Sequence, residues 1–189
     1  MGGEPTLSSF SVLETPIPGV LVLEPRVYSD DRGFFFESYN QRAMAEVGIR
    51  DEFVQDNHSF SRRHVLRGLH YQIRQPQGKL VRAVSGEIFD VAVDLRRSST
   101  TFGRWHGVNL SGENKRLLWI PKGLAHGFVV VSENAHVLYK ATNFYDPASE
   151  RTIAWNDPGL KINWQLRDAP VVSEKDGLGL AFAEAEMFD

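Results

Sequence analysis

Hydrophobic and polar residues alternate along much of the chain, which is the pattern of β-strands with one buried face. In residues 87–95 the apolar side chains from Phe89 to Leu95 fall on one face, and Asp90 and Asp94 fall on the other. We expect this strand to bury only its apolar face. Similar β-rich runs occupy residues 19–27, 53–61, 65–72, 80–84, 105–110, 116–120, 127–131 and 136–144.

Turn-forming residues separate these runs at intervals of roughly ten residues, a spacing typical of a β-sandwich or barrel. Two segments favour a helix: Asn40 is placed to cap residues 41–47 ahead of Gly48, and Ser173 precedes residues 174–176. No alternation of strands with helices occurs, and the glycine-rich phosphate-binding motifs are missing. The pattern therefore predicts an all-β fold.

The composition narrows the class of protein further. The chain has 189 residues, and no linker or repeat interrupts it after Gly19, so we expect one domain over residues 16–189, preceded by a loosely docked arm at residues 1–15. The absence of cysteine excludes disulfide frameworks, thiolate catalysis and cysteine-based metal sites. A net charge of −3 argues against nucleic acid as a partner. No membrane-length apolar run or secretory signal is evident, which predicts a cytoplasmic protein without membrane contact.

Two of the six histidines lie in segments that suggest a site. His70 belongs to Arg67-Gly-Leu-His-Tyr-Gln72, and His126 belongs to a Pro-x-Gly-x-x-His segment that resembles the second half-motif of cupin jelly rolls. Metal-binding cupins carry His-x-His in the first half-motif, whereas Gln72 stands in place of the second histidine here. One imidazole and one amide make a poor site for a transition metal, so we expect none. Taken alone, either histidine fits a half-buried, hydrogen-bonded residue better than a functional one.

Several charged and amide side chains occupy strand positions where burial is costly unless they are paired or hydrated. They are Arg32, Arg67, Lys79 and the Gln55-Asp56-Asn57 run. If these strands line one cavity, the side chains would converge on a diphosphate or carboxylate. If they lie on an outer face, they are ordinary solvated residues. The spacing leaves both interpretations open.

Taken together, the motifs resemble the dTDP-4-dehydrorhamnose 3,5-epimerase family, in order from about Pro16 to Asp176. The segments that carry the resemblance are residues 31–37, 53–59, 66–72, 77–82, 121–128, 139–140, 145–147, 150–158 and 173–176. The resemblance implies a cupin-type jelly roll, in which two antiparallel sheets form a flattened barrel with short peripheral helices. It also implies a homodimer, which a β segment seeking a sheet edge would fit.

The reaction that the resemblance implies is the conversion of dTDP-4-dehydro-6-deoxy-D-glucose to dTDP-4-dehydro-L-rhamnose. This belongs to dTDP-L-rhamnose biosynthesis, which feeds cell-surface polysaccharides such as the lipopolysaccharide O-antigen. The C4 ketone of such a dTDP-4-keto-6-deoxyhexose acidifies the protons on C3 and C5, and loss of either proton gives an enolate. Inversion needs a base on one face of the sugar, an acid on the other and donors at the developing oxyanion. We therefore expect no cofactor.

The resemblance assigns four catalytic residues. His70 matches the base, Asp176 its carboxylate partner, Tyr139 the opposite acid, and Lys79 the residue beside the C4 oxygen. Asp176 also fits a capping box with Ser173, and Tyr139 also fits an ordinary half-buried aromatic position. The positions that match substrate contacts are Arg32, Glu37, Gln55, Asp56, Asn57, Arg67, His126, Glu150 and Lys175, and Phe34 and Tyr145 could stack on the base.

Three other functions remain open at this stage. A relative could invert only C3 or only C5, and motifs do not separate it from a 3,5-epimerase. A metal-dependent cupin enzyme is disfavoured by Gln72. A non-catalytic sugar- or nucleotide-binding jelly roll would not need both a histidine base and a tyrosine acid.

Overall fold

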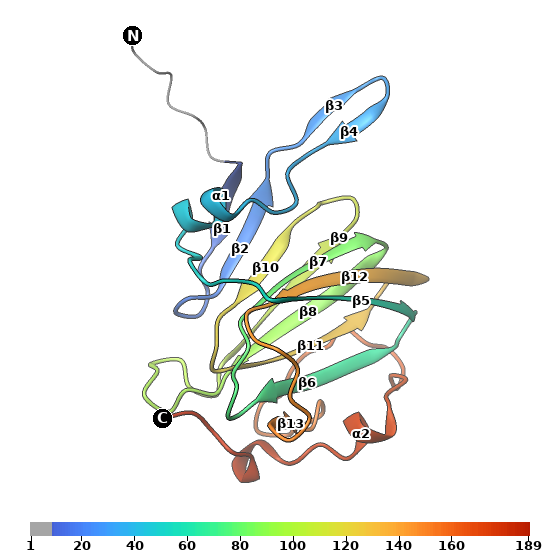
Figure 1. Ribbon diagram of the computed structural model, residues 1–189. Helices are drawn as coiled ribbons and strands as arrows, with labels where there is room; N and C mark the ends of the chain where they lie inside the picture. The colour runs from blue at the N-terminus through green and yellow to red at the C-terminus, as the bar shows by residue number, and fades with distance from the viewer. Residues whose placement is uncertain (1–8) are drawn as a thin grey trace.

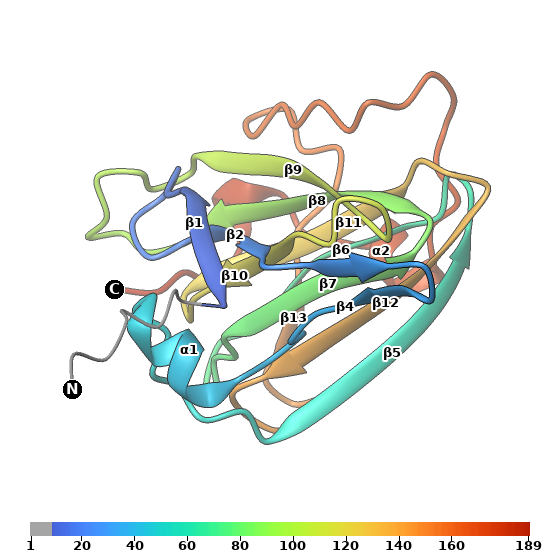
Figure 2. The same cartoon turned by 90° about the horizontal axis from the view of Figure 1, so that it is seen from above.

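The computed structural model describes residues 9–189, and two antiparallel β-sheets packed face to face form most of it (Figures 1 and 2). The larger sheet has the order β1 (Phe10–Glu14), β2 (Leu21–Pro25), β10 (Leu117–Ile120), β7 (Lys79–Ser85), β12 (Asn134–Ala141), β5 (Gln55–Arg62). The smaller sheet has the order β13 (Glu150–Thr152), β6 (Leu66–Gln72), β11 (Leu124–Val130), β8 (Glu87–Asp94), β9 (Trp105–Ser111). We call them the six-stranded and the five-stranded sheet.

Shorter elements lie at the periphery of the two sheets. The hairpin of β3 (Tyr28–Asp30) and β4 (Gly33–Phe35) projects from the sandwich (Figure 1). The described helices are α1 (Gln41–Glu46), α2 (Glu174–Gly177) and the 3₁₀ turn η1 (Phe182–Glu184). The expected all-β jelly roll with short helices is confirmed, and each predicted β-run overlaps a strand. The sequence pattern missed only the short strands β3, β4 and β13 and the strand β1.

A side-chain cap marks the start of each predicted helix. The Asn40 side chain accepts hydrogen bonds from the backbone N–H groups of Arg42 (3.0 Å) and Ala43 (3.2 Å), and Ser173 caps α2. These contacts satisfy donors that a helix start otherwise leaves free.

Apolar side chains form one layer between the sheets and a second layer outside the five-stranded sheet. In the second layer, the C-terminal segment places Ile153, Leu160 and Trp164 against that sheet. Both faces of β8 are therefore covered, and Asp90 and Asp94 are 0% exposed. The expectation of a strand with a solvated polar face is wrong, because a distant segment covers its apolar face and the polar face turns into the sandwich.

The N-terminal segment is more ordered than the expected loose arm. Residues 10–14 form β1, which pairs with β2, and the Phe10 side chain is buried between α1 and the six-stranded sheet. The part of the arm from residue 10 onward is thus an edge strand, while residues 1–8 lie outside the described residues. Within residues 9–189 no helix is long and apolar enough to cross a bilayer.

Candidate active site

A cavity of about 290 Å³ opens between the two sheets. Its walls comprise Ser59, Arg67, His70, Lys79, His126, Phe128, Tyr139, Tyr145, Glu150 and Lys175. It continues into a space of about 190 Å³ where Gln55, Asn57, Gln72 and Gln77 also form the wall. Both sheets contribute, since His70 and His126 lie on the five-stranded sheet while Lys79 and Tyr139 lie on the six-stranded sheet. The structure therefore brings His70, the expected base, to the same cavity as most of the expected contact residues.

The first acid–base group is His70 with Asp176. The Nε2 of His70 lies 2.5 Å from Oδ1 of Asp176, whose carboxyl is almost fully buried. Burial raises the pKa of Asp176, but the hydrogen bond and charge of His70 outweigh it, so the pKa is lowered overall. The Ser173 hydroxyl caps α2 by accepting from the Asp176 N–H at 3.1 Å. Serine thus supplies the cap, and the aspartate carboxylate is left for the imidazole.

A second histidine–carboxylate pair lies beside the first. His126 is the cross-strand partner of His70, and its Nε2 lies 2.9 and 3.0 Å from the two carboxylate oxygens of Asp90. Burial is the largest influence on Asp90 and raises its pKa, although His126 and Lys79 oppose the rise. Sequence reasoning missed Asp90; the available signal was a carboxylate inside an otherwise apolar strand.

Two glycines allow the strands that carry these histidines to approach closely. A Cβ on Gly68 would lie 2.5 Å from the Cα of Gly127, and Gly68 has a φ of +133°. The register of β6 against β11 shifts here, between His126 and Phe128. Any larger residue at either glycine would push the two histidine-bearing strands apart.

Lys79 and Tyr139 form the opposite wall. Burial lowers the pKa of the Lys79 ammonium to about 8, while the charges of Asp90 and Glu150 oppose this effect. Burial raises the pKa of the Tyr139 phenol, and the nearby Arg67 opposes the rise. At neutral pH the cavity thus presents an ammonium and a protonated phenol to whatever occupies it.

A hydrogen-bonded rim runs along one side of the cavity. Glu150 accepts from the Lys175 ammonium and from the Tyr145 hydroxyl, each at 2.8 Å. The side-chain oxygen of Gln55 accepts from the Tyr145 backbone N–H, and its side-chain nitrogen donates to the Asn57 side-chain oxygen, each at 2.9 Å. Burial raises the pKa of Glu150, but its two partners lower it overall, so the rim holds an ionised carboxylate.

The mouth of the cavity carries cations. Arg67 is exposed there, and its Nε donates to the Ser61 hydroxyl at 3.0 Å. Together with Lys79 and Lys175 it suits an anionic ligand. The buried hydroxyl oxygen of Ser59 also lines the cavity and has no hydrogen-bond partner among the described residues. No feature of the sequence points to Ser59 except its place two residues after Asn57, on the same face of the strand.

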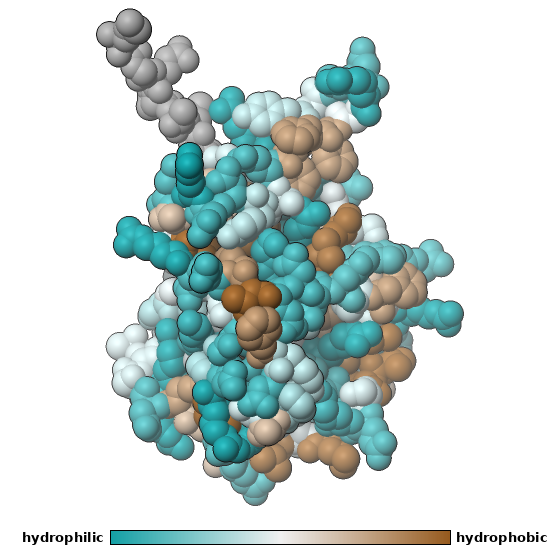
Figure 3. Space-filling model, viewed as in Figure 1, coloured by the Kyte–Doolittle hydropathy of each residue, from teal (hydrophilic) through white to brown (hydrophobic). Residues whose placement is uncertain are grey.

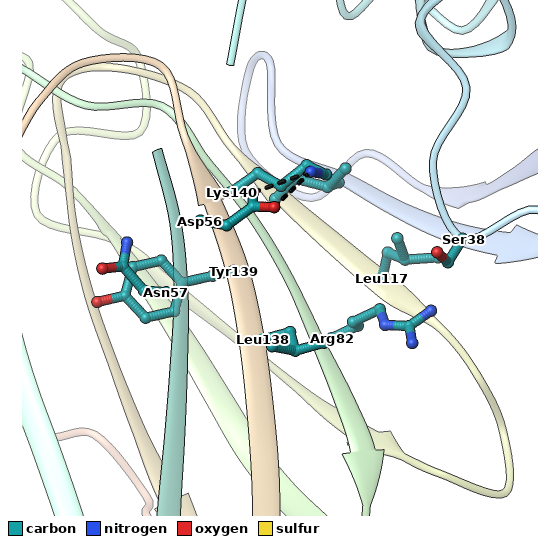
Figure 4. Close-up of a pocket in the computed structure, with 9 residues that line it drawn as sticks. Ser38, Asp56, Asn57, Arg82, Leu117, Leu138, Tyr139 and Lys140 are labelled. Carbon is teal, nitrogen blue, oxygen red and sulfur yellow. Dashed lines mark hydrogen bonds and ion pairs between the residues drawn. The ribbon is translucent and has the colours of Figure 1, made fainter. Parts of the chain in front are cut away.

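Asp56 does not reach the cavity, contrary to expectation. Its carboxylate pairs with Lys140 at 2.9 Å beside a separate pocket of about 160 Å³, while Asn57 and Tyr139 lie together (Figure 4). Successive side chains of a strand point to opposite faces, so Gln55 and Asn57 can share the cavity only if Asp56 faces away.

Three other expected contacts, Arg32, Phe34 and Glu37, also lie outside the cavity walls. Arg32 is exposed and binds Asp30 on the hairpin, and Phe34 is 60% exposed. The Glu37 carboxylate accepts from Asn40 at 2.9 Å. A brown apolar patch lies beside the hairpin in Figure 3. Within one chain, these residues are not brought to the site.

Gln72 stands at the position of a cupin metal ligand, and its side chain is hydrogen-bonded to backbone groups. Its amide donates to the carbonyls of Gln75 (2.7 Å) and Phe144 (3.2 Å), and its oxygen accepts from the Asp146 N–H at 2.9 Å. Among residues 9–189, no group of three or more His, Asp or Glu side chains is placed to hold a metal ion.

Fold and site together define a cupin-type jelly roll with acid–base side chains on facing sheets and cations at the cavity mouth. The sequence model of one family, described as dTDP-4-dehydrorhamnose 3,5-epimerase, matches residues 14–184. The chain belongs to the dTDP-4-dehydrorhamnose 3,5-epimerase family and is an isomerase.

Individual relatives agree. A dTDP-4-dehydrorhamnose 3,5-epimerase of Pseudomonas aeruginosa is 68% identical over 173 residues, covering 91% of this chain and 96% of the relative. The crystal structure of a dTDP-6-deoxy-D-glucose-3,5-epimerase from Legionella pneumophila, in complex with dTDP-4-keto-L-rhamnose, superposes with a TM-score of 0.91 at 50% identity, covering 94% and 95% of the two chains. A 3′-monoepimerase from Streptomyces bikiniensis, in complex with dTDP-quinovose, reaches a TM-score of 0.84 at 31% identity, covering 89% and 86%.

Proposed function

We propose that the cavity inverts C3 and C5 of dTDP-4-dehydro-6-deoxy-D-glucose, giving dTDP-4-dehydro-L-rhamnose, by acid–base chemistry alone. One observation carries the proposal: the His70–Asp176 pair and Tyr139 come from facing sheets and meet at one cavity. A sugar held between them has a base on one face and an acid on the other, which is what inversion requires.

In the first step His70 removes the proton from C3 or C5, next to the C4 ketone. Its Nε2–H is committed to Asp176, which leaves Nδ1 as the basic nitrogen. Asp176 fixes this tautomer and stabilises the imidazolium that forms. The C–H electron pair moves into the enolate, and negative charge develops on the C4 oxygen.

Lys79 and Tyr139 complete the reaction. The Lys79 ammonium, a buried donor in the cavity wall, stabilises the enolate oxygen. The Tyr139 phenol stays protonated because burial raises its pKa, and it delivers a proton to the opposite face of the carbon. Solvent then takes the proton from the His70 imidazolium and returns one to the Tyr139 phenolate, and the same steps at the second carbon invert both centres.

The rim binds the nucleotide part of the substrate. Arg67 and Lys175 face the diphosphate, Tyr145 stacks on the base, and Gln55 and Asn57 supply polar contacts. His126 and Glu150 complete the sugar pocket. These roles rest on the position of each residue at the cavity and on the match to the family.

We also propose a homodimer in which the hairpin serves the partner's site. Arg32 matches a family contact to the ligand and Phe34 could stack on the base, yet the hairpin that carries them projects away from the sandwich (Figure 1). A second copy is the simplest way for both statements to hold. Phe34 of one copy and Tyr145 of the other, both exposed, would then enclose the base.

Product analysis in deuterated water tests the reaction. We expect deuterium at both C3 and C5, and a downstream reductase should convert the product to dTDP-L-rhamnose. Exchange and inversion at a single carbon would identify a monofunctional epimerase instead. Binding without exchange at either carbon would exclude catalysis.

A complementation experiment tests the shared site. We expect His70→Asn and Arg32→Ala to be inactive separately and to regain part of the activity when co-expressed, because each mixed dimer then holds one intact site. No recovery, with mixed dimers shown by mass spectrometry, would place Arg32 in its own chain's site or outside both.

A further inference from the structure

Asp176 belongs to a segment of the chain that otherwise lies on the surface. Among residues 171–180, it is the one buried residue, at 3% exposure. Leu178 and Leu180 are 74% and 49% exposed, and Val172 is only partly buried. Burial of apolar side chains therefore contributes little to keeping this carboxylate in place.

Backbone contacts hold the segment at both ends instead. Before α2, Val171 forms a parallel bridge with Val65, which directly precedes β6. After α2, the Leu180 N–H donates to the carbonyl of Thr152 at 3.0 Å, and the Leu180 carbonyl accepts from the Ala154 N–H at 2.8 Å. The second attachment lies at the end of β13 and is the nearer of the two to Asp176 in the sequence.

The attachment after α2 leaves no room for a side chain at position 179. A Cβ on Gly179 would lie 2.7 Å from the backbone nitrogen of Ala154 and 2.8 Å from the carbonyl carbon of Ile153. Ile153 is 0% exposed, and its backbone exchanges hydrogen bonds of 3.0 and 3.2 Å with Leu69, the neighbour of His70. The sheet is close-packed here, so a side chain at position 179 would displace the exposed segment rather than the sheet.

We infer that Gly179 is a positioning residue for the epimerisation: by letting the segment lie directly on the backbone that follows β13, it sets the Asp176 carboxylate against His70. The inference rests on the proposed role of the His70–Asp176 pair. Gly179 lies three residues after Asp176, so a shift at the glycine moves the carboxylate out of its 2.5 Å contact with Nε2.

Two glycine variants of this segment form a matched pair. Gly177→Ala and Gly179→Ala each add one methyl group close to Asp176, and neither glycine has a positive φ. A Cβ on Gly177 would meet nothing closer than 3.9 Å, so only the variant at position 179 creates a clash. We expect Gly179→Ala to lower kcat by roughly 10²-fold, the cost of misplacing a reacting group by about 1 Å, and Gly177→Ala to keep the wild-type kcat.

Proton NMR of the free protein supplies a readout that does not depend on turnover. The Nε2–H of His70 that is bonded to Asp176 gives a downfield resonance, identified as the one missing from both His70→Asn and Asp176→Asn. We expect Gly179→Ala to lose this resonance or move it upfield, and Gly177→Ala to keep it.

An unchanged resonance in Gly179→Ala would overturn the role of Gly179 and leave the proposed reaction intact. A lost resonance with an unchanged kcat would instead show that turnover does not need the His70–Asp176 pair, and the proposed reaction would fail with the inference. If thermal unfolding shows that Gly179→Ala does not fold, Leu180→Pro takes its place in both measurements. Proline removes the N–H that Leu180 donates to Thr152 and so loosens the same attachment.

Discussion

The two histidine–aspartate pairs are chemically alike and lie on neighbouring strands, yet their surroundings differ. His70 is 25% exposed in its side chain, and its partner Asp176 comes from α2 near the end of the chain. His126 is 8% exposed, and its partner Asp90 lies on the adjacent strand. One imidazole faces a space that a ligand can enter, and the other lies deeper in the wall.

The two aspartates show the consequence of this difference. The pKa of Asp176 is lowered overall because its hydrogen bonds and the charge of His70 outweigh its burial. The pKa of Asp90 is raised because its burial outweighs the effects of His126 and Lys79. The first carboxylate is suited to stabilise an imidazolium that forms during turnover, whereas the ionised form of the second costs stability.

The largest effect should come from replacing the two histidines in turn. We expect His70→Asn to lower kcat toward the upper end of the ~10²–10⁴-fold range for general bases, and to abolish solvent exchange at C3 and C5. His126→Asn should keep measurable exchange and lose more thermal stability, because its side chain is the more buried. Exchange lost in His126→Asn and kept in His70→Asn would reverse the assignment of the two pairs.

Tyr139→Phe should have the next largest effect, lowering epimer formation by roughly 10²-fold. The base at His70 remains, so C–H bonds still break and the enolate can regain a proton from its original side. Deuterium should then enter the unconverted substrate faster than the epimer forms, as NMR in deuterated water would show. A parallel loss of exchange and epimer would place Tyr139 in the deprotonation step.

The contrast between the pairs also shows where sequence reasoning stops. His70, Lys79 and Tyr139 could be predicted because motif matches carry residue identity. Asp90 could not, because alternation shows which side chains share a face of β8 but not which face a later segment covers. The motif match assigns Asp56 to the site, although alternation along β5 turns it away from the face of Gln55 and Asn57, toward Lys140.

The hairpin illustrates a second limit. Arg32 and Phe34 carry motif identity, yet one chain does not bring them to the cavity. The hydrophobic pattern and the motifs predict strands and residue identity within one chain. They do not predict where a projecting hairpin lies in an oligomer, because that depends on contacts between surfaces that follow no sequence periodicity.

A smaller effect is expected on stability, where replacing Asp176 and replacing Asp90 should change the free energy of unfolding differently. The folded pKa of Asp176 is lowered, so its ionised form stabilises the fold above the unfolded pKa of about 3.9, and this stability is lost as pH falls through the folded pKa. Asp176→Asn should therefore lower the free energy of unfolding at pH 7, by roughly 1.5–3 kcal/mol for a hydrogen bond to a charged group.

The folded pKa of Asp90 is raised, so its ionised form costs stability at pH 7, and the cost disappears as pH falls through that pKa. Asp90→Asn should therefore leave the free energy of unfolding at pH 7 unchanged or higher. Urea titrations of both variants at one protein concentration measure the difference. A larger loss of stability in Asp90→Asn than in Asp176→Asn would contradict the comparison.

The smallest expected effect on kcat is that of a chelator, because the Nε2 atom of each imidazole is already hydrogen-bonded. Neighbouring histidines on adjacent strands are the arrangement from which a metal site could be built. Here each Nε2 is bonded to its own aspartate, and the amide of Gln72, the third candidate ligand, is bonded to backbone carbonyls. A metal bound through these Nε2 atoms would have to break both histidine–aspartate pairs, and the proposed reaction needs the His70–Asp176 pair intact. We therefore expect unchanged kcat after exhaustive dialysis against EDTA, with metal content checked by mass spectrometry. Activity that is lost on chelation and restored by one divalent metal would show that the histidines act as metal ligands and would overturn the assignment of His70 as the base.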